Sequence, residues 1–167
     1  WASRRLAAAN VIRKVKYLPL DQRQLMIEKM LDLSGVDLPD DLMLTTNQLQ
    51  RLYNSGVGIG AHTVNHPILA ALDDDAAKCE IRSSKERLEQ LLGEPLVLFA
   101  YPNGKPGVDY LQKHVQMVSD AGFRFAVSTR EAVARKSDPV MEFPRFGPWD
   151  RTSSRLLLRM IRAQLLA

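Results

Sequence analysis

The sequence predicts an α/β fold in which parallel strands alternate with helices. Short apolar runs at 96–100 and 125–127 have the length and composition of buried strands. Apolar residues recur with a helical period at 73–92, before the first run, and at 110–121, between the two runs. This is the order expected of βαβ units. The length of 167 residues and the apolar content of 46% are those of a globular chain with a genuine core.

The N-terminal part of the chain is predicted to be mostly helical. Residues 1–16 place basic side chains among alanines and aliphatic residues, which indicates a basic helix. Apolar residues recur with a helical period at 21–33, where Asp21 is the expected N-cap. Residues 34–41 include glycine and proline and are expected to form a loop.

A third helix and a short strand are expected next. Thr45 or Thr46 is placed to cap a helix over 47–54. Residues 57–61 alternate apolar residues with glycines, which predicts a short strand that another backbone approaches closely. Further along, the helix at 73–92 carries the single cysteine, which is expected to be buried or half-buried, and 141–143 is a further candidate strand.

The C-terminal segment 151–167 is predicted to be a basic amphipathic helix. One interpretation is a surface helix packed on the rest of the domain, and the other is a helix that contacts a membrane surface or a partner. Its basic face is formed by Arg151, Arg155, Arg159 and Arg162.

Composition and charge narrow the classes of partner. The net charge of +4 permits an anionic partner without requiring one. Few aromatic residues lie among the arginines, so stacking on bases is not suggested and no nucleic-acid partner is expected. One cysteine excludes a disulfide within the chain. No apolar run approaches the roughly 20 residues that a membrane-spanning helix needs.

Two of the three histidines, His62 and His66, follow the predicted strand at 57–61. Neutral imidazole nitrogens bind divalent metals such as zinc. Pro67 disfavours the helical region at His66, so we expect the pair on a strand-to-loop turn. The stronger helical zinc signature, His-Glu-x-x-His, is not found in the sequence. The spacing therefore predicts a candidate metal site without establishing it.

Three segments resemble one known family. The segment His62-Thr63-Val64-Asn65-His66-Pro67 resembles the His-Ser/Thr-x-x-His-Pro motif of the polysaccharide deacetylases, also called carbohydrate esterase family 4. Phe99-Ala100-Tyr101-Pro102-Asn103-Gly104 resembles the substrate-groove loop of that family, and residues 121–129 are similar to its late helix-to-strand segment. The order and spacing of the segments agree with the family, over roughly residues 42–150.

The resemblance implies an incomplete or distorted (β/α) barrel of the polysaccharide deacetylase type over 1–150. Residues 1–41 are then a mostly helical insertion, and 151–167 is a separate C-terminal helix. The family takes its third metal ligand and its catalytic base from an Asp-Asp pair on the first strand. No Thr-Phe-Asp-Asp-like segment occurs here, so that strand is expected to precede residue 1. The run of aspartates at 73–75 follows the histidines and is typical of a helix N-terminus.

The resemblance also implies roles for individual residues. His62 and His66 are implied as ligands of a divalent metal, with zinc the expected one. Arg145 is expected either to orient the catalytic base, because Ala100 stands where the family usually has an arginine, or to end a strand at the surface. The general acid is unassigned, because His114 is expected to face solvent or to pack within its helix. The implied substrate-binding residues are Tyr101, Pro102, Asn103, Gly104 and Trp149, although Trp149 could equally plug the barrel end.

The implied function is metal-dependent hydrolysis. The family removes N-acetyl or O-acetyl groups from polysaccharides, including cleavage of carbon–nitrogen non-peptide bonds, so a polysaccharide with N-acetylated sugars is the expected partner. The alternative is a non-catalytic carbohydrate-binding or scaffolding remnant of the same fold. Unpaired strand edges in an incomplete barrel predict a homo-oligomer. The sequence leaves localisation open between the cytoplasm and the cell envelope of a bacterium.

Overall fold

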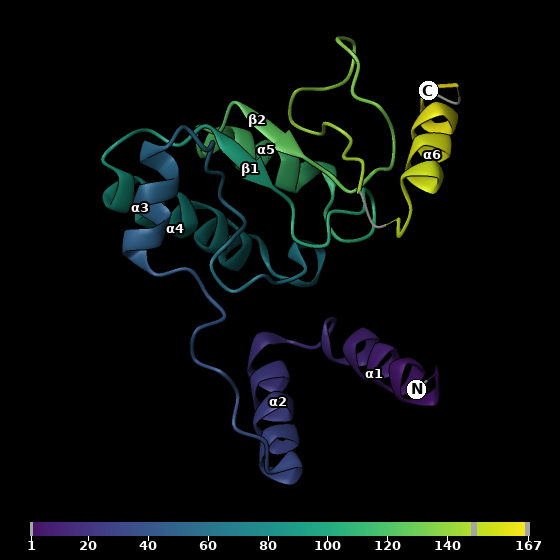
Figure 1. Cartoon of the computed structure of the whole chain (residues 1–167). Helices are drawn as coiled ribbons and strands as arrows, with labels where there is room; N and C mark the ends of the chain where they lie inside the picture. Colours follow the sequence, from purple (N-terminus) through teal and green to yellow (C-terminus); the bar gives the residue numbers. More distant parts are fainter. Residues whose placement is uncertain (1, 148–149, 166–167) are drawn as a thin grey trace. The chain divides into compact units, whose positions relative to one another are not determined.

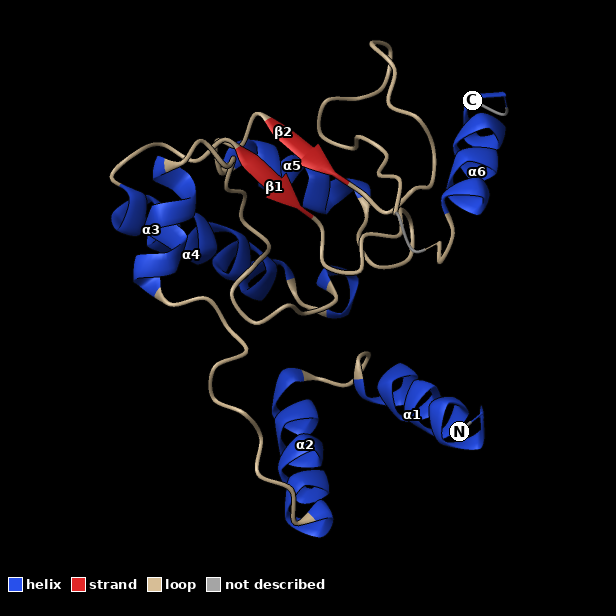
Figure 2. Ribbon diagram, viewed as in Figure 1, coloured by secondary structure: helices blue, strands red, loops and turns tan. Residues whose placement is uncertain are grey.

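The computed structural model describes residues 2–147 and 150–165 and contains helices with a small parallel sheet (Figures 1 and 2). The chain divides into two compact units, Trp1–Val57 and Gly58–Ala167, called here the N-terminal and C-terminal units. The N-terminal unit contains α1 (Ala2–Val15), α2 (Leu20–Ser34) and α3 (Thr46–Asn54). The C-terminal unit contains η1 (Leu69–Ala71), α4 (Asp74–Leu92), β1 (Leu98–Ala100), α5 (Gln112–Asp120), β2 (Phe125–Val127) and α6 (Ser153–Leu165).

Local sequence signals set the ends of the helices in the N-terminal unit. The predicted N-cap of α2 is wrong, because Pro19 holds that position and Asp21 lies in the first turn. Proline with its fixed φ suits the start of a helix, and a carboxylate in the first turn favours the helix dipole. Thr45 caps α3 as predicted, in a capping box in which Thr45 N–H donates to Gln48 Oε1 at 2.8 Å.

The sheet of the C-terminal unit is small and parallel. β1 and β2 pair with Phe99 opposite Ala126. Isolated parallel bridges join Ala61 to Phe99 on one side and Phe143 to Val127 on the other. The strands predicted at 57–61 and 141–143 are therefore wrong as full strands, since only single bridges form in these segments.

Glycine explains the poor pairing of the segment before Ala61. The backbone there comes so close to β1 that a Cβ on Gly60 would lie 3.2 Å from the Leu98 carbonyl oxygen. This confirms the predicted close approach of two backbones. Glycine also weakens a strand because it has no side chain to pack. The segment therefore reaches the sheet with only Ala61 in strand-like register.

The core lies between one face of the sheet and the helices α4 and α5. Side chains alternate between the two faces along each strand. Phe99 and Ala126 are buried on the face toward the helices, whereas Leu98 and Phe125 remain exposed on the other face. In Figures 1 and 2, α5 lies behind the two strands. The buried cluster joins both strands to both helices and includes Ala77, Ile81, Phe99, Val115, Val118 and Ala126.

The structure confirms an α/β chain but does not confirm a barrel. The described residues hold two paired strands and isolated bridges, which amount to a partial sheet. The ends of α4 agree with the sequence, since Asp73 caps its start and Gly93 closes it at a φ of 74°. α5 begins at Gln112, later than expected. The domain division at residue 150 stays a prediction.

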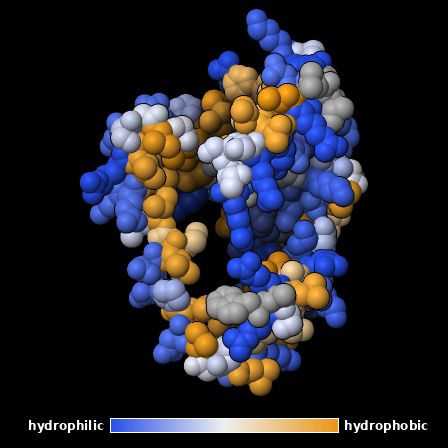
Figure 3. Space-filling view, turned by 45° about the vertical axis from the view of Figure 1, so that its right-hand side comes forward, coloured by the Kyte–Doolittle hydropathy of each residue, from blue (hydrophilic) through white to orange (hydrophobic). Residues whose placement is uncertain are grey.

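Two features of the surface complete the fold. Cys79 is exposed, so the prediction of a buried or half-buried thiol is wrong; it lies on the solvent side of α4 while Glu80 and Ile81 face inward. Apolar side chains reach the surface in several places (Figure 3). Leu157, Leu158 and Ile161 of the amphipathic α6 are among the exposed apolar residues. In the part of the chain that the structure describes, no helix has both the length and the apolar character to cross a membrane.

Candidate functional site

His62 and His66 lie together on the turn that follows the bridge at Ala61. Their ring centroids are 4.7 Å apart, in an edge-to-face arrangement. His62 Nδ1 lies 2.7 Å from the carbonyl oxygen of Ala100, at the end of β1. Because a carbonyl only accepts, Nδ1 carries the hydrogen and Nε2 carries the lone pair. In this tautomer Nε2 can bind a metal while Nδ1–H is held by a carbonyl, as is common for metal-binding histidines.

The turn between the histidines has unusual backbone geometry. Thr63 and His66 have φ values of 62° and 52°, in the left-handed region. Such conformations cost about 1–3 kcal/mol each for residues other than glycine. His66 stays out of the right-handed helical region, as the following proline predicts. The geometry therefore persists only if other contacts hold the turn.

Glu80 of α4 supplies such contacts and was missed by the sequence analysis. Its Oε2 accepts the N–H groups of Val64 and Asn65 at 2.8 and 2.9 Å, and its Oε1 accepts the Asn65 side-chain amide at 2.6 Å. Glu80 is buried, with 9% of its surface exposed. A carboxylate on the buried side of a helix, next to Ile81, was the signal available in the sequence.

Electrostatics at His62 favour the neutral ring. His62 is exposed as a residue, but partial desolvation of its imidazole lowers the pKa of His62, and the charges of His66 and Arg145 lower it further, against the opposing effect of the Ala100 carbonyl. Neutral imidazole is the metal-binding form. Arg145 is exposed at the end of the sheet, and its Nε donates to the Ser128 carbonyl oxygen at 2.8 Å. Its positive charge acts on His62.

An apolar cavity of about 290 Å³ adjoins His62. It lies against the face of the sheet that the helices do not cover, since Leu98 and Phe125 line it. The other lining residues are Gly60, Ala61, Phe99, Ala100 and Val127. The histidine is the polar side chain at this wall, so the cavity suits a small apolar group held beside it.

The segment 101–104 follows Ala100 directly, but its aromatic residue turns away from solvent. Tyr101 is 0% exposed, stacks on Tyr110 with ring centroids 3.8 Å apart, and donates its hydroxyl to the Met141 carbonyl at 3.0 Å. Burial also raises the pKa of Tyr101 well above its ordinary value. The Tyr101 ring therefore fills the core, which argues against the implied role of Tyr101 in binding substrate.

The rest of that segment forms a tight turn that Thr129 holds through two hydrogen bonds. Asn103 and Gly104 have φ values of 54° and 71°. Thr129 Oγ1 donates to the Asn103 carbonyl and Thr129 N–H to the Gly104 carbonyl, both at 2.7 Å. Pro102 is buried and Asn103 is half-buried. Pro102 and Gly104 are buried and set the turn, while Asn103 remains partly exposed.

Other predicted residues are placed as follows. Trp149 lies outside the described residues. His114 is fully buried, with Nδ1 accepting the Leu111 N–H at 2.9 Å, so it packs within its helix, one of the two outcomes expected. Among residues 2–147 and 150–165, no group of three or more histidine, cysteine, aspartate or glutamate side chains is arranged to hold a metal. The metal candidates therefore remain a pair.

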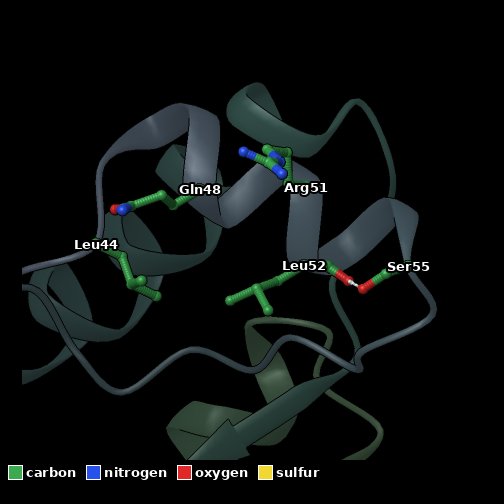
Figure 4. Close-up of a pocket in the computed structure, with 5 residues that line it drawn as sticks. All are labelled: Leu44, Gln48, Arg51, Leu52 and Ser55. Atoms are coloured by element: carbon green, nitrogen blue, oxygen red, sulfur yellow. Dashed lines mark hydrogen bonds between the residues drawn. The ribbon is translucent and has the colours of Figure 1, made fainter.

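A second cavity lies within the N-terminal unit. Its volume is about 400 Å³, and Leu44, Gln48, Arg51, Leu52 and Ser55 line it (Figure 4). In the close-up, Ser55 donates its hydroxyl to the Leu52 carbonyl at 2.7 Å. None of the site residues predicted from the sequence lines this cavity, so the histidine turn remains the candidate site.

The family model described as "Polysaccharide deacetylase" matches residues 24–126, which include both histidines and the turn at 101–104. The protein YxkH of Bacillus subtilis (strain 168) is 23% identical over 93 residues, which are 56% of this chain and 32% of that protein. The chain thus spans about a third of the length of this relative.

Solved structures show the same fold. The Streptococcus pyogenes deacetylase PplD, in complex with acetate, is 26% identical with a TM-score of 0.65, over 72% of this chain and 52% of that one. BC0361, a polysaccharide deacetylase from Bacillus cereus, is 23% identical with a TM-score of 0.61, over 74% of this chain and 38% of that one. Both similarities cover most of the present chain and about half or less of the other.

Proposed function

The chain belongs to the polysaccharide deacetylase family, and we propose from this premise that it is part of a metal-dependent hydrolase that removes acetyl groups from a polysaccharide containing N-acetylated sugars. The observation that carries the proposal is the histidine pair, with rings 4.7 Å apart and His62 held by the Ala100 carbonyl. The family model covers this pair, and the chemistry of the two rings suits the family's reaction.

His62 and His66 would hold the metal, and zinc is the divalent ion we propose. The donor set fits zinc in part: two imidazoles from one turn, one fixed in the metal-binding tautomer. Catalytic zinc has three protein ligands as a rule, so at least one further ligand must join the pair. When bound, such a metal lowers the pKa of water to about 7 and polarises a carbonyl.

The chain's own residues would orient the substrate around the pair. The apolar cavity of about 290 Å³ beside His62 is suited to the methyl end of an acetyl group. Asn103 is the residue of the 101–104 turn that we propose to contact the sugar, because it is the one residue of these four that is not buried. Arg145 would favour negative charge near the histidines, since its own charge already acts on His62.

A non-catalytic carbohydrate-binding remnant is the second candidate. The observation favouring it is that the described residues bring no third metal-ligating side chain to the pair. A protein that keeps the cavity and the turn could still bind a sugar without hydrolysing it. The two candidates differ in whether acetate is released.

Two partners are proposed besides the polysaccharide. The edges of the partial sheet, where only the single bridges at Ala61 and Phe143 flank β1 and β2, support association of copies of the chain; light scattering that finds only monomer would contradict this. The exposed apolar residues of α6 beside its arginines support contact with an anionic membrane surface, which sedimentation with anionic vesicles would test.

A zinc titration followed by an acetate assay tests the main proposal. We expect calorimetry to detect zinc binding that the His62→Ala/His66→Ala double variant loses and that His114→Gln, at the histidine outside the pair, keeps. Acetate release from N-acetylglucosamine oligomers with zinc would support the enzyme, and zinc binding without release would favour the remnant. Absence of zinc binding by the chain would reject the metal site as proposed.

A further inference from the structure

Glu80 makes a set of contacts that ties α4 to the histidine turn. Three N–H groups point at its two carboxylate oxygens: the backbone amides of Val64 and Asn65 and the side-chain amide of Asn65, at 2.6 to 2.9 Å. Val64 and Asn65 are the two residues immediately before His66, in the stretch between the histidines. The contact therefore acts on the backbone that sets the spacing of the two rings.

The turn needs such an anchor because its backbone is strained. Thr63 and His66, on either side of the two anchored residues, both have positive φ values of 62° and 52°. Residues other than glycine keep such conformations only where surrounding contacts enforce them. Two successive backbone N–H groups converging on one carboxylate oxygen are that kind of contact, and they fix the path of the chain from His62 to His66.

The chemistry of the side chain explains why a carboxylate stands there. An ionised carboxylate only accepts hydrogen bonds, and it accepts at both oxygens, which matches the three donors that the turn directs at it. Charge-assisted hydrogen bonds are about twice as strong as neutral ones. A buried carboxylate would be unfavourable without them. Glutamine offers one acceptor oxygen and an amide. The oxygen could still accept the two backbone N–H groups, but the amide would face the Asn65 side-chain amide unless Asn65 reversed it.

We propose that Glu80 is a positioning residue for the His62–His66 metal pair: it holds the strained turn so that both rings face one ion. The inference rests on the proposed function for the identity of the ion. The positioning itself is a property of the metal-free chain. Its two consequences, a fixed turn and a preorganised pair, are measurable separately.

The test compares Glu80→Gln and Glu80→Ala with Ser84→Ala. Ser84 is the matched control, because it is buried one turn further along α4 and donates to the Ile81 carbonyl at 2.8 Å without touching the turn. We expect Glu80→Ala to speed hydrogen exchange of the Val64 and Asn65 amides about tenfold or more, and to shift the ring nitrogen resonances of His62. Glu80→Gln should give a smaller change in the same direction. Ser84→Ala should leave both unchanged.

Zinc affinity is the second readout. Loss of a group that orients metal ligands weakens metal binding roughly 10- to 100-fold, so both Glu80 variants should bind zinc less tightly than Ser84→Ala. Unchanged exchange and unchanged ring resonances in both Glu80 variants would overturn the positioning role, whether or not zinc binds. A chain that binds no zinc, but shows these changes on substitution, would reject the proposed metal and keep the positioning.

Discussion

α2 and α4 are helices of 15 and 19 residues that differ in how much of their surface is buried. α4 buries Ala77, Glu80, Ile81 and Ser84, whereas α2 buries no residue. Both have apolar residues at helical spacing, so the spacing alone does not decide whether a helix packs. The difference lies in what each helix faces: α4 meets the sheet and α5 within one core.

The two units should therefore draw their stability from different sources. Helix stability in proteins comes mainly from burial of an apolar face and only weakly from propensity. The C-terminal unit has that burial. The N-terminal unit has local interactions such as the capping box of α3 and the Gly35 closure of α2. Substitutions at matched positions in the two units test whether their stability has different sources.

Truncation of a packed side chain should give the largest difference. Ile81→Ala removes a fully buried side chain of α4 and should lower the free energy of unfolding of the C-terminal unit by about 2–5 kcal/mol. Leu25→Ala, on α2, removes a side chain that is 52% exposed and should change stability by no more than about 0.5 kcal/mol. Urea unfolding followed by circular dichroism measures both. Equal losses would mean that α2 packs as α4 does.

One glycine in each unit has a positive φ, and the two differ in whether an added Cβ would meet neighbouring atoms. Gly104 has a φ of 71°, and an added Cβ would lie 2.9 Å from the Tyr101 carbonyl oxygen. Gly35 has a similar φ of 59° with nothing within 4 Å of an added Cβ. We expect Gly104→Ala to cost about 2–4 kcal/mol, and Gly35→Ala about 1 kcal/mol, in thermal unfolding. Similar losses would show that φ alone, and not the contact, determines the cost.

The features that the sequence could predict are those that depend on contacts between residues close together in the chain. The caps at Thr45 and Asp73 and the closing Gly93 were predictable, because each acts within one turn of its helix. The pairing of His62 with His66 was also predictable from a spacing of four. These signals are read from neighbours in the sequence and need no knowledge of the rest of the fold.

Contacts between distant segments were not predictable in this way. Tyr101 was expected in a groove, and only its stacking on Tyr110 and its bond to the Met141 carbonyl, 40 residues away, show that it belongs to the core. Glu80 lies 15 residues from Asn65 and carries no sign of its partner in the sequence. The expected strand at 57–61 failed because pairing depends on side chains that glycine lacks.

The smallest expected effect is a pH dependence confined to the C-terminal unit, which contains all three histidines. Burial lowers the pKa of His114 below the ordinary 6.5, and the charge of Lys113 adds to this against the opposing charge of Asp74. Protonation would also place a hydrogen on Nδ1, which now accepts the Leu111 N–H. In the described residues the buried Nε2 has no hydrogen-bond partner.

The sign follows from the lowered pKa. Below pH 6.5 the unfolded chain binds a proton at His114 that the folded chain does not, so stability is full above that pH and falls as the pH drops toward the folded pKa. One proton limits the slope to about 1.4 kcal/mol per pH unit. His62 contributes in the same direction, because partial desolvation of its ring also lowers its pKa.

The His114→Gln variant separates the contribution of His114 to the pH dependence of stability from that of His62. Glutamine at this third helical position can still accept the Leu111 N–H, so the helix start is kept while the titration is removed. Urea unfolding at pH 7.5 and 5.5 should show a smaller loss of stability on acidification in the variant than in the parent chain, with the remainder assigned to His62. A parallel loss in both proteins would mean that His114 already takes up its proton in the folded state. The N-terminal unit has no histidine, so local exchange rates in α2, corrected for intrinsic pH effects, should not report this transition.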